Sequence, residues 1–130
     1  MIIGIGSDIV QIPRIEKLIH QFGDKFLKRI FTEEEQHLVK KFTDDHKICG
    51  YYAKRFAAKE ACAKALGTGI RHGIAFTDFS VVSDMDGKPE IKLLHKAREL
   101  LSARSYKTKV HLTLSDDYPS AFAMVVIESL

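Results

Sequence analysis

The stretch Arg55–Gly69, with the sequence RFAAKEACAKALGTG, carries the most regular pattern in the chain. Small residues recur every four positions in and just before it, at Ala53, Ala57, Ala61 and Ala65. On a helix this spacing places all four methyl groups on one face, where another backbone can approach closely. Gly67 is suited to the left-handed residue that ends a helix. The sequence therefore predicts a helix from about Cys49 to Leu66 that packs tightly against a neighbouring element.

Charged residues occupy other positions of the same helix, in two pairs that are each four residues apart. These pairs are Arg55 with Lys59 and Glu60 with Lys64. Such pairs are common on solvated helix faces, where each stabilises the helix by only about 0.2–0.5 kcal/mol. The alternative is that these charges bind a ligand. The pattern of charges alone leaves both interpretations open.

The Gly67-Thr68-Gly69 run directly beyond these pairs also has two interpretations. It can simply cap the helix. Alternatively, its glycines let backbone N–H groups approach a phosphate, and Thr68 adds a hydroxyl group. A Walker-type loop is excluded, because that motif precedes its helix rather than following it. A phosphate bound here would therefore contact side chains and loop amides.

The N-terminal segment MIIGIGSDIV predicts a strand from about Ile2 to Asp8. Gly4 and Gly6 weaken a strand, and such glycines often mark the close approach of another backbone or a ligand. Asp8 at the expected strand end is either a turn residue or a ligand. Mg²⁺ takes one or two carboxylates and completes its octahedron with waters and substrate phosphates. Asp8 and Glu60 are such a pair if the strand end meets the helix.

Helical and strand patterns fill the rest of the chain. Helical patterns begin at Pro13 and at His95. A third begins at the capping box formed by Thr32 and Glu35 and extends to about Phe42. Strand patterns cover residues 76–83, 90–94, 109–115 and 121–130, and the last is apolar enough for a central strand. The sequence therefore predicts a single α+β domain over residues 1–130, built from antiparallel strands and packed helices.

The composition is that of a soluble globular chain, since 45% of its 130 residues are hydrophobic and 28% are charged. No apolar run reaches the roughly 18 residues of a transmembrane helix. The N-terminus lacks the basic leader of a signal peptide. We therefore expect a cytoplasmic protein without membrane contact, in which Cys49 and Cys62 remain reduced.

Positive charge is concentrated in residues 13–29. This segment holds five basic and two acidic side chains, so its excess of three equals the net charge of +3 of the whole chain. The excess is either a solvated helix face or a docking face for an acidic partner. The segment lacks aromatic platforms among its basic residues, which single-stranded nucleic acid needs. Nucleic acid is therefore not expected as a partner.

Two blocks of the sequence, taken together, resemble a known family. They are GIGSDIVQIPRI, from Gly4 to Ile15, and RFAAKEACAKALGTG. Both resemble the signature blocks of holo-[acyl-carrier-protein] synthase, the short bacterial type of 4′-phosphopantetheinyl transferase. FTEEE near residue 31, DGKP at residues 86–89 and the terminal AMVVIESL are also in family order. The resemblance covers essentially the whole chain, and the two blocks at this spacing are highly specific.

The resemblance implies a Mg²⁺-dependent reaction on the 4′-phosphopantetheinyl transferase fold. Such enzymes transfer the phosphopantetheine arm of coenzyme A to a serine of apo acyl carrier protein. They release adenosine 3′,5′-bisphosphate and support fatty acid biosynthesis. The family assembles as a homotrimer with active sites at subunit interfaces. The resemblance also implies that the acidic carrier docks on the basic helix beginning at Pro13, with Arg14 as the best candidate contact.

The resemblance assigns roles to individual residues. Asp8 and Glu60 match the metal ligands, and Lys64 matches the lysine beside the phosphates. The positions that match residues near the coenzyme are Arg55, Lys59, Lys64, Gly67 and Thr68. Asp116 departs from the pattern, because the family often has a histidine after the corresponding strand, and Asp116 cannot offer a positive charge to a phosphate. It binds through water, accepts a proton or lies outside the catalytic site. The candidate catalytic residues are Glu60, Lys64 and Asp116.

The chemistry of the reaction agrees with these residue types. Attack of a serine hydroxyl on a phosphoryl group needs alignment, charge neutralisation and a proton acceptor. Mg²⁺ between Asp8 and Glu60 would bridge diphosphate oxygens, and Lys64 would neutralise the remaining charge. The proton acceptor is either Glu60 or a metal-bound water.

Two functions from other classes remain open on the sequence. The first is a non-catalytic module that holds an acidic protein or nucleic acid through the basic helix. The second is a small hydrolase that acts on a nucleotide diphosphate with the same metal pair. The module predicts that Asp8→Ala leaves function intact. The hydrolase predicts release of the bisphosphate without any carrier protein.

Overall fold

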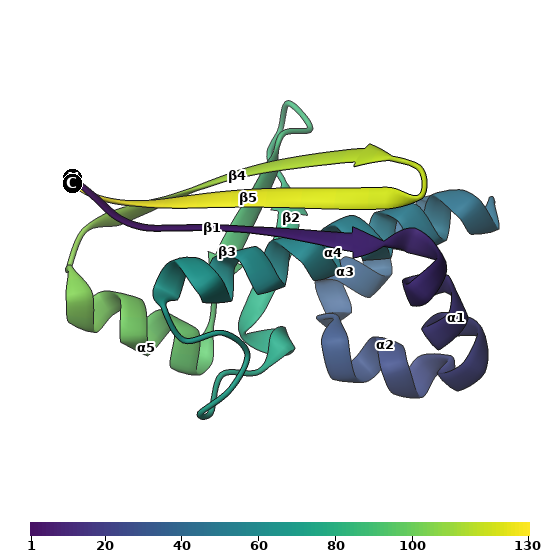
Figure 1. The fold of residues 1–130 in the computed structure, drawn as a ribbon, viewed down its shortest axis with the longest axis horizontal. Helices are drawn as coiled ribbons and strands as arrows, with labels where there is room; N and C mark the ends of the chain where they lie inside the picture. Colours follow the sequence, from purple (N-terminus) through teal and green to yellow (C-terminus); the bar gives the residue numbers. More distant parts are fainter.

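A three-stranded antiparallel sheet forms one layer of the molecule (Figure 1). The computed structural model describes all residues from 1 to 130. The strand order is β1-β5-β4, and the strands span Ile2–Gln11 (β1), Thr108–Asp117 (β4) and Ser120–Ser129 (β5). The apolar last strand is therefore central, as its sequence predicts. Two short strands, β2 (Phe79–Ser83) and β3 (Pro89–Leu93), form a separate antiparallel hairpin.

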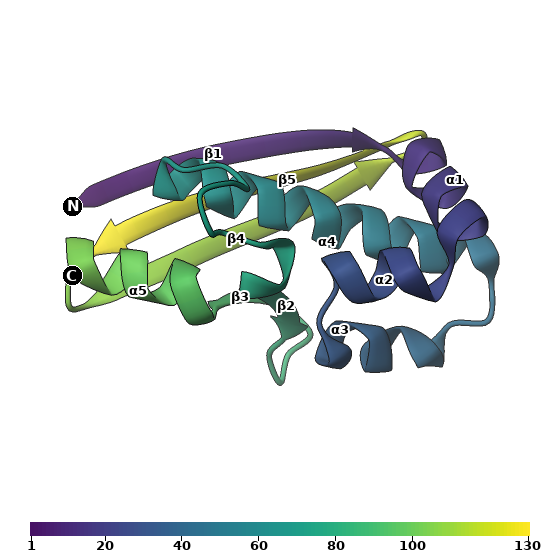
Figure 2. The same ribbon diagram turned by 90° about the horizontal axis from the view of Figure 1, so that it is seen from below.

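The long helix α4 (Asp45–Leu66) lies along the inner face of this sheet and forms the second layer (Figure 2). It begins four residues before its predicted start, because the side chain of Asp44 caps it by accepting from the backbone N–H of His46 at 2.8 Å. Gly67 ends the helix in the left-handed conformation, with φ of 85°, as predicted. Both cysteines therefore lie inside this helix, and both are free and buried.

Strand β1 and helix α4 pack with their backbones in direct contact. A Cβ atom added to Gly4 would collide with the carbonyl oxygen of Ala65, and one added to Gly6 would collide with the carbonyl oxygen of Ala61. Only glycine fits at these two positions, because any larger residue would push the strand off the helix. The alanine face and the two glycines, each predicted separately to allow a close approach, are thus complementary halves of one interface.

Shorter helices gather at the two ends of this interface (Figures 1 and 2). At the end to which β1 runs lie α1 (Ile12–Phe22), α2 (Asp24–Ile30) and α3 (Glu33–Leu38). At the other end lies α5 (His95–Arg104), next to the two chain termini. The predicted capping box is present in full at the start of α3, although this helix is shorter than predicted and continues as a 3-10 turn, Val39–Lys41.

Two strand boundaries differ from the expectation. Strand β1 continues through Gln11, so Asp8 lies inside the strand, opposite Ala123 of β5, rather than at its end. The predicted strand at residues 76–83 begins with a 3-10 turn, Phe76–Asp78. Helix α2 was not predicted from the sequence. The other elements have the predicted type and order, and the α+β class with antiparallel strands is confirmed.

The outer face of the three-stranded sheet carries exposed apolar side chains on β1 and β5. Ile5 and Ile9 of β1 are 60% and 64% exposed, and Phe122 of β5 stands opposite Ile9 across the strand pair. Apolar side chains gathered on one sheet face are typical of a contact surface. None of the helices combines the length and the hydrophobicity that a transmembrane span needs.

Candidate active site

Asp8 and Glu60 lie where β1 runs along the C-terminal half of α4. Side chains alternate along a strand, so Asp8 points to the same side of the sheet as Gly6 and Val10, which is the side covered by α4. Glu60 directly precedes Ala61, the residue whose carbonyl oxygen approaches Gly6. The tight contact at Gly6 therefore brings the strand close to this turn of the helix. Asp8 follows Gly6 by two residues on the same side of the strand, and its side chain is only 18% exposed.

Lys64 joins the strand to the helix at this point. Its ammonium group donates to Oδ1 of Asp8 at 3.1 Å and to the backbone carbonyl oxygen of Ser7 at 3.0 Å. Strand β1 is an edge strand, and a carbonyl on a free edge needs a partner from outside the sheet. The side chain of Lys64 remains half exposed, so it is placed to contact a ligand as well.

The carboxyl group of Glu60 experiences all the charges of this cluster. Burial raises the pKa of Glu60 above its ordinary value, and the negative charge of Asp8 raises it further. The positive charges of Lys64 and Arg14 act in the opposite direction. Asp8, Lys64 and Arg14 therefore all lie near enough to Glu60 to act on its carboxyl group through their charge. The structure thus brings together both predicted metal ligands, the predicted phosphate lysine and the predicted partner contact.

This cluster has the chemistry of a site for a hard divalent cation. Asp8 and Glu60 offer carboxylate oxygens from two different elements, which is the number of protein carboxylates that Mg²⁺ commonly uses. The half-exposed Lys64 marks the side open to solvent, where waters and phosphate oxygens could complete an octahedron. In this structure the ammonium of Lys64 balances the charge of Asp8, as a cation would.

Lys59 lies in the core, away from the cluster. Its ammonium group is fully buried and donates to Oε1 of Glu35 at 2.6 Å and to the carbonyl oxygens of Phe76 and Phe79. Glu35 in turn accepts from the backbone N–H groups of Thr32 and Val81. All three N–H bonds of the ammonium thus have acceptors. The structure therefore gives Lys59 a place in a buried ion pair that joins α3, α4 and β2, and its match to a residue near the coenzyme stays a prediction.

The Gly67-Thr68-Gly69 run lies further along the helix than the carboxylates. Seven residues separate Glu60 from Gly67, or about 10 Å along the helix axis. Thr68 is half-buried, and its hydroxyl donates to the carbonyl oxygen of Gly69 at 2.9 Å. Both glycines of the run have positive φ, 85° and 67°. The run therefore acts as the predicted helix cap, and only an extended ligand could contact both it and the carboxylates.

Asp116 and Arg55 line a second, basic cavity of about 390 Å³. Asp116 forms an ion pair with Lys54 at 3.5 Å, and the guanidinium of Arg55 stacks on the ring of Tyr51 at 3.5 Å from its centroid. The other positively charged or titratable side chains of this cavity are Lys41, His46 and Lys47. Lys41, His46 and Lys47 were not predicted from the sequence as site residues. Lys47, Tyr51 and Lys54 share one helix face, but the predicted helix began after Lys47.

Comparison with known proteins identifies the class. A family model described as 4′-phosphopantetheinyl transferase superfamily matches residues 4–123 of the chain. The chain that adopts this fold and forms the carboxylate cluster therefore belongs to this superfamily. A curated holo-[acyl-carrier-protein] synthase from Cereibacter sphaeroides is 48% identical over 132 residues, which cover 99% of this chain and 94% of the relative. Within the superfamily, the chain is a member of the holo-[acyl-carrier-protein] synthase family.

Solved structures agree with this assignment. A holo-(acyl-carrier-protein) synthase from Bacillus anthracis, in complex with CoA (3′,5′-ADP), superposes with a TM-score of 0.81 at 39% identity and covers 100% of this chain and 99% of that one. The synthase from Helicobacter pylori, in complex with coenzyme A, has a TM-score of 0.79 at 34% identity and covers 95% and 99%. The resemblance stated from the two sequence blocks and the predicted enzyme class are therefore confirmed.

Proposed function

We propose that this protein transfers the 4′-phosphopantetheine group of coenzyme A to a serine of apo acyl carrier protein. Membership of the holo-[acyl-carrier-protein] synthase family supports the reaction class. The observation that carries the proposal is the cluster of Asp8, Glu60 and Lys64, in which two carboxylates and one ammonium converge from β1 and α4. With a carrier protein as acceptor, the reaction would serve fatty acid biosynthesis, and we place it in the cytoplasm.

The cluster would supply the electrostatic part of the reaction. Asp8 and Glu60 would hold Mg²⁺, which when bound would neutralise diphosphate charge. Lys64 would turn from Asp8 to a phosphate oxygen. The serine oxygen forms a bond to the phosphorus that carries the pantetheine arm, and the bond from this phosphorus to the bridging diphosphate oxygen breaks. Adenosine 3′,5′-bisphosphate leaves with that oxygen, and the serine proton passes to Glu60 or to a water in the cluster.

The surface beside the cluster fits an acidic partner. Arg14 on α1 is exposed and close enough to Glu60 to lower the pKa of its carboxyl group. Further along, α1 and α2 enclose a mainly apolar groove of about 400 Å³, which is lined by Leu18, Phe22, Lys25, Phe26, Arg29, Ile30 and, from the 3-10 turn, Phe76. An apolar groove with basic side chains at its edge suits an amphipathic helix with acidic flanks. We propose that the carrier protein docks here.

The outer sheet face supports the proposed homotrimer. Ile5 and Phe122 of this face also line a pocket with Ser7 and Lys64. The exposed apolar face is therefore continuous with the side of the cluster on which Lys64 is open to solvent. Another copy packed against this face would border the cluster, which would place the active site at a subunit interface.

The direct test is to incubate the protein with coenzyme A, Mg²⁺ and apo acyl carrier protein and then to measure the mass of the carrier. A mass gain of one phosphopantetheine group supports the proposal. Release of adenosine 3′,5′-bisphosphate in a reaction that contains no carrier protein would instead support a hydrolase. Carrier binding without either product, with Asp8→Ala binding as well as the wild type, would support a non-catalytic module.

A further inference from the structure

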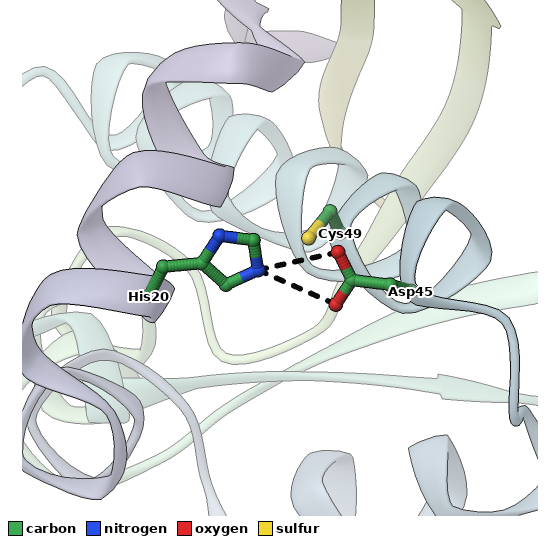
Figure 3. Close-up of side chains that lie close together, drawn as sticks. All are labelled: His20, Asp45 and Cys49. Carbon is green, nitrogen blue, oxygen red and sulfur yellow. Dashed lines mark hydrogen bonds and ion pairs between the residues drawn. The ribbon is translucent and has the colours of Figure 1, made fainter.

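A second group of metal-ligating side chains lies between α1 and the start of α4. His20 comes from α1, and Asp45 and Cys49 come from α4, where they are one helical turn apart (Figure 3). Cys49 and Glu60 are separated by eleven residues of the same helix, or about 16 Å along its axis. This group is therefore distinct from the carboxylate cluster of the active site.

The three ligand atoms are arranged compactly. Nε2 of His20 lies 3.2 Å from Oδ2 and 3.4 Å from Oδ1 of Asp45, and these atoms and Sγ of Cys49 all lie within 4.8 Å of one another. Two ligands bound tetrahedrally to zinc at about 2.0–2.1 Å are separated by about 3.3 Å. An exposed His–Asp ion pair is common by itself. Here a thiol lies beside the pair, and Figure 3 shows all three groups pointing toward one another.

The site is open on one side and closed on the other. The side chains of His20 and Asp45 are 53% and 62% exposed, whereas Cys49 is buried beneath them. A cation held by the exposed imidazole and carboxylate would therefore lie beside the thiol.

We propose that His20, Asp45 and Cys49 form a binding site for Zn²⁺, which ties α1 to the first turns of α4. The ligand set of one imidazole, one carboxylate and one thiolate favours zinc over Mg²⁺, which prefers oxygen ligands. A water or the carboxylate of Glu16, one turn before His20, completes a tetrahedral set. Binding displaces the proton of the Cys49 thiol. This site does not depend on the proposed transferase reaction.

The test uses Co²⁺ as a spectroscopic substitute for zinc, on the full chain without a histidine tag and in excess Mg²⁺. The wild type is expected to show a sulfur-to-cobalt charge-transfer band and the visible bands of tetrahedral cobalt. Cys49→Ala is expected to lose the charge-transfer band. Cys62→Ala, which removes the other buried thiol of the same helix, is the matched control and is expected to keep it.

His20→Gln and Asp45→Asn change exposed positions, so they test the site even if Cys49→Ala fails to fold. Loss of an outer-shell partner already weakens metal affinity about 10–100-fold, so loss of either ligand is expected to weaken Co²⁺ and Zn²⁺ binding at least tenfold. Zinc should also raise the unfolding temperature of the wild type but not of His20→Gln. A wild type without the charge-transfer band, a band retained in Cys49→Ala, or unchanged affinity in His20→Gln would overturn the proposal.

Discussion

The ammonium group of Lys64 lies 3.1 Å from Oδ1 of Asp8, although 56 positions of sequence separate the two residues. The contact exists because Gly4 and Gly6 let β1 lie directly on the backbone of α4. A side chain from the middle of the strand and one from the helix are thereby brought to the same point. The packing of the fold and the geometry of the candidate active site thus have a common origin in two glycines and a face of alanines.

Gly6→Ala tests this packing. The added methyl group would collide with the carbonyl oxygen of Ala61, and both partners are backbone that cannot rotate away. We expect a loss of about 1–3 kcal/mol or more in the free energy of unfolding, measured by urea denaturation. Gly50→Ala is the matched control, because a Cβ atom there has no neighbour within 4 Å. Gly50 lies inside α4, where alanine is expected to add about 1 kcal/mol of stability. Equal stabilities for the two variants would contradict the packing argument.

Lys59→Met tests whether the buried lysine belongs to the core or to the coenzyme. The substitution leaves the carboxylate of Glu35 buried without its cation. We therefore expect a loss of about 3–5 kcal/mol in the free energy of unfolding. Pairing it with Glu35→Gln in a double-mutant cycle should recover part of that loss. A stable variant with a raised KM for coenzyme A would instead show that Lys59 contacts the coenzyme.

Lys64→Ala should separate function from stability. Its ion pair with Asp8 involves a half-exposed lysine, and pairs of this kind contribute about 0–1 kcal/mol. Removing one group that stabilises transition-state charge commonly lowers kcat by about 10²–10³-fold. We expect a loss of that size in carrier modification, followed by mass spectrometry, with nearly unchanged denaturation. Full activity in the variant would show that Lys64 does not contact the reacting phosphates.

Glu60→Gln should stabilise the protein without metal at neutral pH while it abolishes activity. Folding raises the pKa of Glu60, so this carboxyl favours the folded state when protonated. Its stabilising effect is complete below the ordinary pKa of 4.5 and is lost as the pH rises through the raised value. The gain of the variant over the wild type should therefore appear at pH 7 and vanish below about pH 4.

Thermal unfolding at both pH values, with a chelator present, measures this difference. Glu99→Gln on the exposed surface of α5 removes the same charge far from the cluster and provides the baseline. If Glu60→Gln were no more stable than Glu99→Gln at neutral pH, burial and the charge of Asp8 would not destabilise the ionised carboxylate of Glu60 in the folded state.

Local patterns predicted the central part of the fold. The four-residue spacing of alanines and the glycines of the first strand indicated a close backbone contact, and the structure pairs them residue by residue. The nearly continuous apolar run at residues 121–130 predicted the central strand. The first prediction succeeded because close backbone contact requires small residues, and the second because a strand that is apolar along most of its length has to be covered by neighbouring elements.

The sequence was less informative where a long-range partner decides the outcome. The sequence around Lys59 is the same as for a solvated lysine on a helix. Lys59 is a core residue only because Glu35 and two backbone carbonyl groups, all distant in sequence, contact its ammonium group. The predicted helix began at Cys49, whereas α4 begins at Asp45 after its cap, Asp44. His46 and Lys47, which line the basic cavity around Asp116, therefore fell outside the predicted helix. The contact between His20 and Asp45 likewise required the packing of α1 on α4.

The central claim is that Asp8 and Glu60 hold Mg²⁺ together with the diphosphate of coenzyme A. Two carboxylates leave most of the octahedron to waters and phosphates, so the metal should bind weakly alone and more tightly once the coenzyme is present. Calorimetric titration of Mg²⁺ with and without coenzyme A measures this directly, with Asp8→Asn as the variant for comparison. The account predicts a large gain in Mg²⁺ affinity for the wild type and little or none for Asp8→Asn. Equal Mg²⁺ binding by the wild type with and without coenzyme A would contradict it.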